Sequence, residues 1–460
     1  MKRISQKIIE TWVQFGPRFL PFADVATDDL PLSRLLRLSL FQVSVGIILV
    51  LLVGTLNRVM IVELRVPASL VAVMISLPLL FAPFRALIGY RSDTHRSQLG
   101  WRRVPYMWVG TLLQFGGLSM MPFALLVLSG GGQSSNAPAW IGQLGAAVSF
   151  LLVGAGLHMT QTVGLALAND LVKEESQPKV VGLMYVTMLV GMIASALIFG
   201  ELLSEYSPGR LIQVIQGAAL VTMALNVIAL WKQECRDRAR VAAKEITASF
   251  SESWRVFSQG NHAMRRLLAV GLGTMAFTME DILLEPYGGE ILNMSVGATT
   301  TLTATLAIGG LCGFGLASHV LAKGYDAFRM AMNGALVGLP AFLAVILAAP
   351  LGSPTVFAIG ILLIGFGSGL FGHGTLTATM RFAPKKQSGL ALGAWGAVQA
   401  TAAGTAIALG GIIRDLASPV VGAASGYIVV YIIEIILLLA AIFIMLPLVK
   451  CKLRFAADAA

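Results

Sequence analysis

Long apolar runs constrain this chain more than any other feature of its sequence. Twelve stretches are each long enough, at about 20 residues, to cross the hydrocarbon core of a membrane as an α-helix. They fall at about 34–58, 66–90, 104–129, 139–168, 179–203, 210–231, 265–286, 296–321, 328–350, 354–380, 388–412 and 424–449. Only 12% of the residues are charged, against about 25% in soluble domains. The sequence therefore predicts an all-α membrane protein with twelve transmembrane helices.

The twelve runs divide into two sets of six. The predicted parts are an N-terminal segment 1–33, a bundle 34–231, a central loop 232–264, a second bundle 265–449 and a tail 450–460. Short patterns recur between the bundles, since Val66-Pro67-Ala68-Ser69 and Val296-Gly297-Ala298-Thr299 open equivalent runs. Six plus six helices with internal repeats are typical of transporter folds with a central cavity.

Basic residues are distributed unevenly between the two sides of the membrane. An even number of crossings places both termini on one side, and 29 of the 33 lysines and arginines fall on that side. The other side has only Arg58, Arg65, Arg210 and Arg414. The excess predicts that both termini are cytoplasmic. The net charge of +10 thus reflects topology, and nucleic-acid binding is not expected.

Two further stretches have apolar residues at helical spacing. They lie within the segment 1–33 and within the central loop 232–264. Both suit helices that lie on the cytoplasmic membrane surface, or that pack against the bundle. The three cysteines, Cys235, Cys312 and Cys451, are scattered, so neither a disulfide framework nor a dedicated metal site is expected.

An acidic stretch, Glu280 to Glu290, ends the apolar run 265–286 on the outer side. Acidic side chains in a membrane helix are costly unless a cation, a polar group or water meets them. Pro286, Gly288 and Gly289 are expected to end the helix.

An arginine ends the equivalent run of the first half on the same side. Arg58 follows Asn57 there, and we predict an ion pair of Arg58 with Glu285 or Asp281 that ties the two halves together. Separate solvation of each charge is the alternative. The candidate outer gate comprises Asn57, Arg58, Glu280, Asp281, Glu285 and Tyr287.

A second motif lies between the runs 66–90 and 104–129. Gly89-Tyr-Arg-Ser-Asp93 followed by Arg102-Arg103 is similar to the loop motif of the major facilitator superfamily, with a longer spacing to the basic pair. Salt bridges and helix caps from these residues are expected to lock the inner face. Arg85 either pairs with Asp93 or extends its charge to the membrane surface.

Two longer stretches resemble one branch of that superfamily. One is Gly54-Thr-Leu-Asn57-Arg58-Val-Met-Ile-Val-Glu63-Leu, and the other is Leu284-Glu285-Pro286-Tyr287-Gly288-Gly289. Together they resemble the bacteriochlorophyll-delivery branch, the light-harvesting assembly factors of the PucC/LhaA type. The resemblance covers the chain from about Phe19 to Lys450.

The resemblance implies a function in assembling antenna complexes rather than in catalysis. It implies a multi-pass protein in the inner, intracytoplasmic membrane of an anoxygenic phototroph, which hands over bacteriochlorophyll as a transient cargo. The implied partners are antenna α and β polypeptides or the reaction-centre core complex, and enzymes of pigment synthesis are possible partners.

Two histidines are candidate pigment ligands. In a major-facilitator arrangement His158 and His373 would lie in cavity-lining helices at similar depth, each among glycines. Neutral imidazole is a good metal ligand, and glycines let a flat macrocycle or a neighbouring helix come close. The alternative is that each histidine forms an interhelical hydrogen bond.

Glu434 is the one acidic residue deep in the run 424–449. That run is expected at the periphery of the fold, so Glu434 is a candidate for contact with a partner helix. Otherwise it is protonated or bonded to a neighbouring helix.

Two other functions compete with pigment handover. A proton-coupled transporter of the same fold would use the buried acids and His158 as a proton relay. A membrane prenyltransferase would need paired aspartate-rich motifs to hold magnesium diphosphate. Asn169-Asp170-Leu-Val-Lys-Glu174 resembles such a motif only faintly, so no enzymatic activity is expected.

Overall fold

The computed structural model describes residues 32–80, 88, 91–92, 101–131, 134, 136–172, 177–234, 262–382 and 388–457. The first half contains α2 (Leu32–Leu49), η2 (Val50–Leu56), η3 (Val59–Glu63), α3 (Ala68–Leu80), α5 (Val104–Leu128), α6 (Ala139–Asp170), α7 (Gln177–Leu202) and α8 (Pro208–Leu230). The second half contains α11 (Ala263–Ala276), η6 (Glu280–Ile282), α12 (Leu284–Glu290), α13 (Val296–Ala322), α14 (Ala327–Leu351), α15 (Pro354–Phe382), α16 (Ser388–Val421) and α17 (Ala423–Ala457). Both surface helices expected in the segment 1–33 and the central loop 232–264 lie outside the described residues.

The described helices have the lengths and the surface of a membrane protein. Eleven of them are long and apolar enough to cross a membrane, and the shorter apolar helix Ala68–Leu79 lies in the remaining predicted run. Large apolar side chains such as Phe123 and Phe443 are about 70% exposed on the outside of the bundle, where lipid would cover them. The predicted all-α membrane fold is confirmed.

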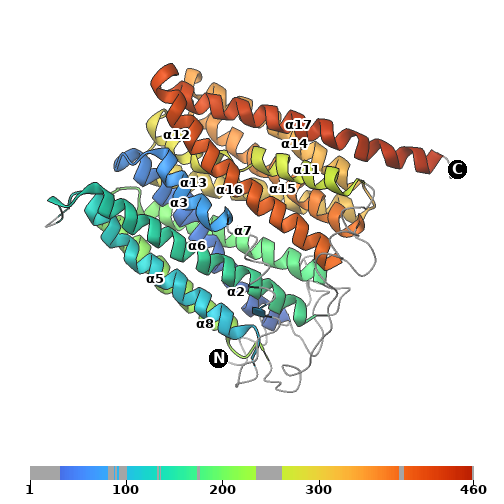
Figure 1. Ribbon diagram of the computed structural model, residues 1–460, viewed down its shortest axis with the longest axis horizontal. Helices are drawn as coiled ribbons and strands as arrows, with labels where there is room; N and C mark the ends of the chain where they lie inside the picture. The colour runs from blue at the N-terminus through green and yellow to red at the C-terminus, as the bar shows by residue number, and fades with distance from the viewer. Residues whose placement is uncertain are drawn as a thin grey trace, which may run out of the picture.

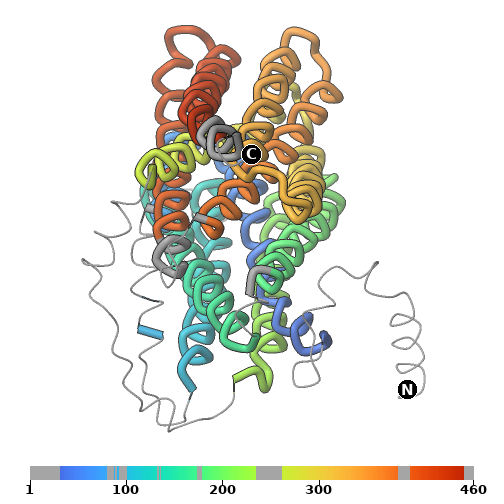
Figure 2. The backbone as a smooth tube through the Cα atoms, turned by 90° about the vertical axis from the view of Figure 1, so that its right-hand side faces the viewer, coloured from blue at the N-terminus to red at the C-terminus, as the bar shows by residue number. Residues whose placement is uncertain are grey.

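The two halves lie side by side, as Figures 1 and 2 show by the separation of blue and green from yellow and red. Helix α3 packs against α16, and α7 packs against α13, and the π-helical end of the first crossing also contacts the second half. The final helix α17 continues to Ala457, beyond the end predicted at residue 449. The residues from Lys450 to Arg454 are mostly good helix formers, which allows the helix to continue past the apolar run.

We call the end of the bundle that contains Arg34, Arg102 and Gln233 the basic end. The opposite end, which contains α12 and the start of α13, is the acidic end. At the acidic end the halves meet at glycines. A methyl group on Gly297 would lie 2.4 Å from the carbonyl oxygen of Gly200, and one on Gly411 would lie 2.5 Å from Cβ of Ala72. Small residues thus let the backbones of the two halves touch.

The close contact at Gly297 makes this residue sensitive to added volume. We expect Gly297→Ala to destabilise the protein by about 1–3 kcal/mol, because backbone atoms of Gly200 and Ser204 must move. Gly315→Ala, in the same helix with nothing within 4 Å, is the control and should stabilise by about 0.5–1 kcal/mol. Thermal unfolding of both variants in one detergent measures the difference. Equal stabilities would contradict the close packing.

The orientation of the bundle is a prediction that site-specific labelling can test. Glu205 at the acidic end has a side chain that is 88% exposed, and Lys323 is exposed at the basic end. In a cysteine-free background, we expect Glu205→Cys to react with a membrane-impermeant maleimide from the periplasm. Lys323→Cys should react only after the cytoplasmic face is opened. The reverse pattern would show that the predicted topology is inverted.

Candidate functional site

The seventh crossing is broken within the membrane. It consists of α11, a short 3₁₀ turn at Glu280–Ile282, and α12. The prediction that Pro286, Gly288 and Gly289 end this helix is wrong, because all three lie inside α12 and the break comes before them. Pro286 is the third residue of α12, a first-turn position where proline is tolerated.

Pro286 nevertheless leaves one backbone carbonyl without its helical donor. An amide at position 286 would donate to the carbonyl of Ile282, four residues earlier, but proline has no N–H. The side-chain nitrogen Nδ2 of Asn57 donates to this carbonyl at 2.8 Å, and Asn57 is fully buried. A membrane interior supplies no water for such a group. Asn57 of the first crossing therefore provides the hydrogen bond that the carbonyl of Ile282 lacks in the seventh crossing.

Asn57 lies in a part of the first crossing where the backbone departs from the α-helix. After α2, the chain forms two π-helical segments, Val50–Leu56 and Val59–Glu63, with Asn57 and Arg58 at their junction. Wide i→i+5 turns are rare and occur often at functional sites. A further contact beside the junction joins the hydroxyl groups of Thr55 and Thr300 at 3.3 Å.

Arg58 does not form the predicted ion pair with Glu285 or Asp281. Its guanidinium pairs with Glu63 and donates to the carbonyl of Met294 at 3.2 Å. The π-helical turn brings residues five apart together, which places Glu63 beside Arg58. The side chain still reaches the second half, because a methyl group on Gly289 would lie 2.9 Å from its Nε and Nη2. The predicted tie between the halves therefore exists, but neutral backbone groups form it.

Glu285 turns toward a small cavity between the halves. Thr303 donates to its carboxylate, and a methyl group on Gly54 would lie 2.4 Å from its Oε1. The cavity holds about 150 Å³ and is also lined by Asp281. Both acids therefore face the interface between the first, seventh and eighth crossings, and Gly54 makes room for one of them.

Glu280 does not line that cavity. It is 1% exposed, and Glu434 on α17 is fully buried. No described residue forms an ion pair with either one. Burying a charged carboxyl group without a cation is costly, which sets these two acids apart from Glu63 and Glu290, which pair with arginines. The prediction that Glu434 faces a partner protein is wrong, since its side chain is fully buried.

Tyr287 lies in the core of the second half rather than at a gate. Its fully buried ring packs against Phe357, Tyr427 and Tyr431, with ring centroids 5.4, 5.3 and 5.5 Å away. Its hydroxyl donates to the carbonyl of Val345 at 3.3 Å. The ring therefore anchors α12 to α14, α15 and α17.

A second polar cluster at the acidic end escaped prediction. Arg414 on α16 contacts Glu290 at 2.5 Å and Asp415 at 3.0 Å, and it lies over the ring of Tyr427. Asp415 also accepts from the backbone N–H of Ser69 at 2.7 Å, which caps α3 of the first half. The Arg-Asp pair directly after the apolar run 388–412 was the signal in the sequence.

The two predicted pigment ligands lie on α6 and α15. Both are half-buried, and neither lines the cavity that contains Asp281 and Glu285. The ring of His373 lies edge-on to Phe314 with centroids 4.3 Å apart. His158 as a pigment ligand remains a prediction, as does His373.

The glycines around the histidines mostly serve helix packing. A methyl group on Gly156 would lie 2.5 Å from the carbonyl oxygen of Gly110, and one on Gly369 would lie 2.5 Å from that of Gly310. Gly164 is covered by Phe41, whereas Gly372 has nothing within 4 Å. Neighbouring helices therefore occupy most of the space that a macrocycle would need.

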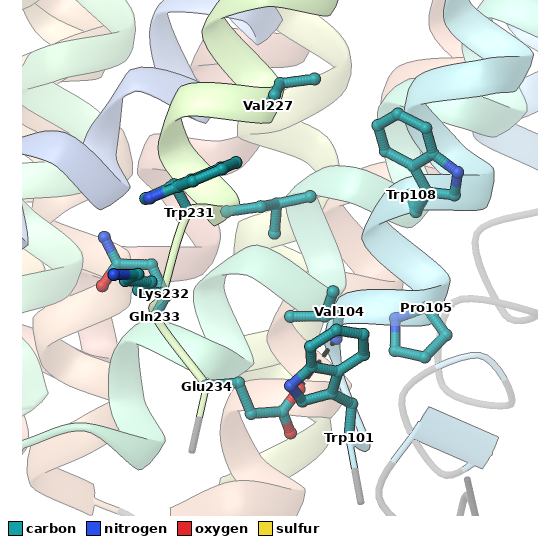
Figure 3. A pocket seen from close by; sticks show the side chains of 10 residues that line it. Trp101, Val104, Pro105, Trp108, Val227, Trp231, Lys232, Gln233 and Glu234 are labelled. Atoms are coloured by element: carbon teal, nitrogen blue, oxygen red, sulfur yellow. Dashed lines mark hydrogen bonds between the residues drawn. The ribbon is translucent and has the colours of Figure 1, made fainter. Parts of the chain in front are cut away.

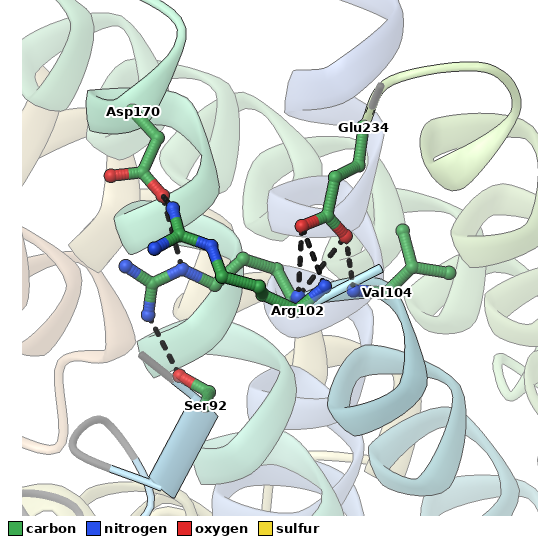
Figure 4. Close-up of polar contacts among 6 residues, drawn as sticks. Ser92, Arg102, Val104, Asp170 and Glu234 are labelled. Carbon is green, nitrogen blue, oxygen red and sulfur yellow. Dashed lines mark hydrogen bonds and ion pairs between the residues drawn. The ribbon is translucent and has the colours of Figure 1, made fainter. Parts of the chain in front are cut away.

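At the basic end, polar contacts fix the start of α5 (Figure 4). Arg103 pairs with Asp170 at 3.1 Å and donates to Ser92 at 2.7 Å, and Arg102 contacts Asp170 at 3.4 Å. Glu234, a residue that the sequence analysis missed, accepts from the backbone N–H groups of residues 102–104 at 2.8–3.1 Å. Its carboxylate caps the positive end of the helix dipole. The other motif residues, Arg85, Gly89 and Asp93, lie outside the described residues.

Comparisons with known proteins agree on one family. Residues 55–453 match the family model described as PUCC protein. A Protein PucC of Rhodovulum sulfidophilum is 64% identical over 90% of this chain and 92% of its own length. A Protein PucC of Cereibacter sphaeroides is 56% identical, over 97% and 98% of the two chains.

Two more distant matches extend the picture. The Bacteriochlorophyll synthase 44.5 kDa chain of Rhodobacter capsulatus is 27% identical over 83% of this chain and 87% of its own length. A solved bacterial homologue of the human lysosomal transporter Spinster has a TM-score of 0.67 at 13% identity. It covers 90% of this chain and 96% of its own. The second match shows that the fold is of the major facilitator type.

Proposed function

The chain belongs to the PUCC protein family, and from this we propose that it is an assembly factor that hands bacteriochlorophyll to antenna polypeptides. The observation that carries the proposal is family membership over nearly the whole chain, with relatives whose names refer to PucC and to bacteriochlorophyll synthesis. Antenna α and β polypeptides or the reaction-centre core are the proposed recipients. The inner membrane of an anoxygenic phototroph, with both termini in the cytoplasm, is the proposed location.

The size of the central cavity supports handover rather than bulk transport. Sites that enclose a drug-sized molecule have about 300–1,000 Å³, whereas the cavity beside Asp281 and Glu285 holds about 150 Å³. A pigment larger than such a molecule does not fit there. We therefore propose that the pigment passes along the membrane-facing surface while the bundle acts as a scaffold.

Affinity purification in mild detergent tests the proposal. We expect the tagged protein to co-purify with antenna polypeptides and with less than one bacteriochlorophyll per chain, measured by absorbance and mass spectrometry. A strain that lacks the antenna genes is the control, and it should yield the protein with pigment but without these polypeptides. A colourless protein free of antenna polypeptides from the wild-type strain would contradict the proposal.

A proton-coupled transporter remains a second candidate, and one observation favours it. Glu280 and Glu434 are buried acids that form no ion pair with any described residue, and buried ionisable groups in membrane proteins often mark proton pathways. Glu434→Gln keeps the shape of the side chain but removes its proton exchange. Unchanged antenna levels in this variant would argue against transport, and loss of antenna at normal protein levels would favour it.

A further inference from the structure

A wide groove lies at the basic end of the first half. It lies between α5 and α8 and holds about 900 Å³, six times the volume of the central cavity. Figure 3 shows its lining, in which Trp101, Trp108 and Trp231 surround the space from three sides and Val104 and Val227 lie between them. Three of the seven tryptophans of the chain thus line one site.

The groove is held in shape from both walls. Helix α8 ends at Leu230, and Lys232 adopts a left-handed backbone with φ of 54°, a conformation that costs a non-glycine residue about 1 kcal/mol or more. The next two residues anchor this turn. Gln233 exchanges hydrogen bonds with Arg34 at 2.7–3.3 Å, and Glu234 caps α5. The indole of Trp231 consequently stays 61% exposed toward the groove and its surroundings.

We propose that this groove binds the ring of a bacteriochlorophyll, a flat, apolar tetrapyrrole with carbonyl groups at its rim. The inference rests on the proposed function and assigns its site. Indole rings stack on flat π-systems and bury a large apolar area. The N–H groups of Trp108 and Trp231 can donate to carbonyl oxygens at the rim of the pigment.

The side chains of Glu234 and Gln233, which line the groove, already form hydrogen bonds within the protein. Glu234 is bonded to three backbone N–H groups, and Gln233 is bonded to Arg34. The groove therefore recognises the ring by its faces and rim rather than by a bond to magnesium. It follows that a metal-free tetrapyrrole should bind nearly as well as the magnesium form, which a histidine ligand would not allow.

Tryptophans also collect at membrane boundaries without binding a ligand, so the test needs a matched control. Trp140 at the start of α6 is 61% exposed at the acidic end, the same exposure as Trp231. It is absent from the groove lining. A change at Trp140 alters the membrane boundary but not the proposed site.

The experiment uses the full chain in lipid nanodiscs. Bacteriochlorophyll and its metal-free form, bacteriopheophytin, are titrated separately, and binding is followed by pigment absorbance and by quenching of tryptophan fluorescence. Trp108→Leu combined with Trp231→Leu should weaken binding of both pigments about tenfold, as expected for two lost aromatic contacts. Trp140→Leu should stay within about twofold of the unmodified protein. Thermal unfolding confirms that the variants are folded.

The outcomes separate this inference from the function it rests on. Normal pigment binding in the double tryptophan variant, together with loss of binding in His158→Leu with His373→Leu, would overturn the groove but leave pigment handover intact. A magnesium form that binds more than tenfold tighter than the metal-free form would also overturn it. Absence of binding to the unmodified protein would overturn both the groove and the proposed function.

Discussion

Arg58→Glu is expected to lower the free energy of unfolding by about 3–5 kcal/mol, because it places a carboxylate in a buried position without a cation beside it. The side chain of Arg58 is 4% exposed and pairs with Glu63. The variant would place two carboxylates together and would face the carbonyl of Met294 with a negative charge. Denaturant unfolding in detergent measures the loss of stability, and antenna levels in cells measure its effect on function.

A second substitution can show which residue is the partner of Arg58. Glu63→Arg added to Arg58→Glu restores an ion pair between the same two positions and should recover part of the stability. Glu285→Arg added to Arg58→Glu should not, because Glu285 bonds to Thr303 instead. Recovery by Glu285→Arg alone would contradict the arrangement and would support the direct pair that the sequence suggested.

Arg414→Leu is expected to destabilise the protein by about 2–3 kcal/mol. Its removal leaves Glu290 and Asp415 without their cation and removes the contact with the ring of Tyr427. Breaking one partner of a mostly buried pair costs much more than breaking an exposed pair.

Arg210→Leu is the matched control for this change. Arg210 lies at the same end of the bundle, but its contact with Glu205 is 3.7 Å long between side chains that are 43% and 88% exposed. Such a pair contributes about 0–1 kcal/mol. Similar losses of stability in both variants, measured by thermal unfolding, would show that the Arg414 cluster is not a buried network.

The fold was predictable because hydrophobic length and charge asymmetry are properties of each segment by itself. The apolar runs defined most crossings to within a few residues, but α16 continues to Val421 and α17 to Ala457, each eight or nine residues past the predicted end. The acidic stretch and Asn57 also identified the region where the halves join. These signals depend on local composition, which can be read from the sequence without knowing the fold.

The partners within that region were not predictable, since they depend on backbone geometry. Pairing of Arg58 with Glu63 follows from a π-helical turn, and nothing in the residues Val59–Glu63 distinguishes such a turn from an α-helix. The helix was expected to end at Pro286, but it is interrupted earlier, before Glu280, and Pro286 lies inside α12. The groove lined by Trp101 and Trp231 joins residues 130 positions apart, so only the packing of α5 on α8 shows it.

The π-helical segment Val50–Leu56 fixes the length of the first crossing more strictly than its composition. Substitutions among its apolar residues leave the course of the backbone intact, but deletion of one residue would relax the wide turn into an ordinary α-helix. Because a π-helical turn holds one residue more than an α-helical turn, the flanking parts of the helix would keep their orientation while residues inside the segment moved around its axis. Gly54 would then no longer face Glu285. Relatives that keep this contact are therefore expected to vary here in residue type and not in residue number.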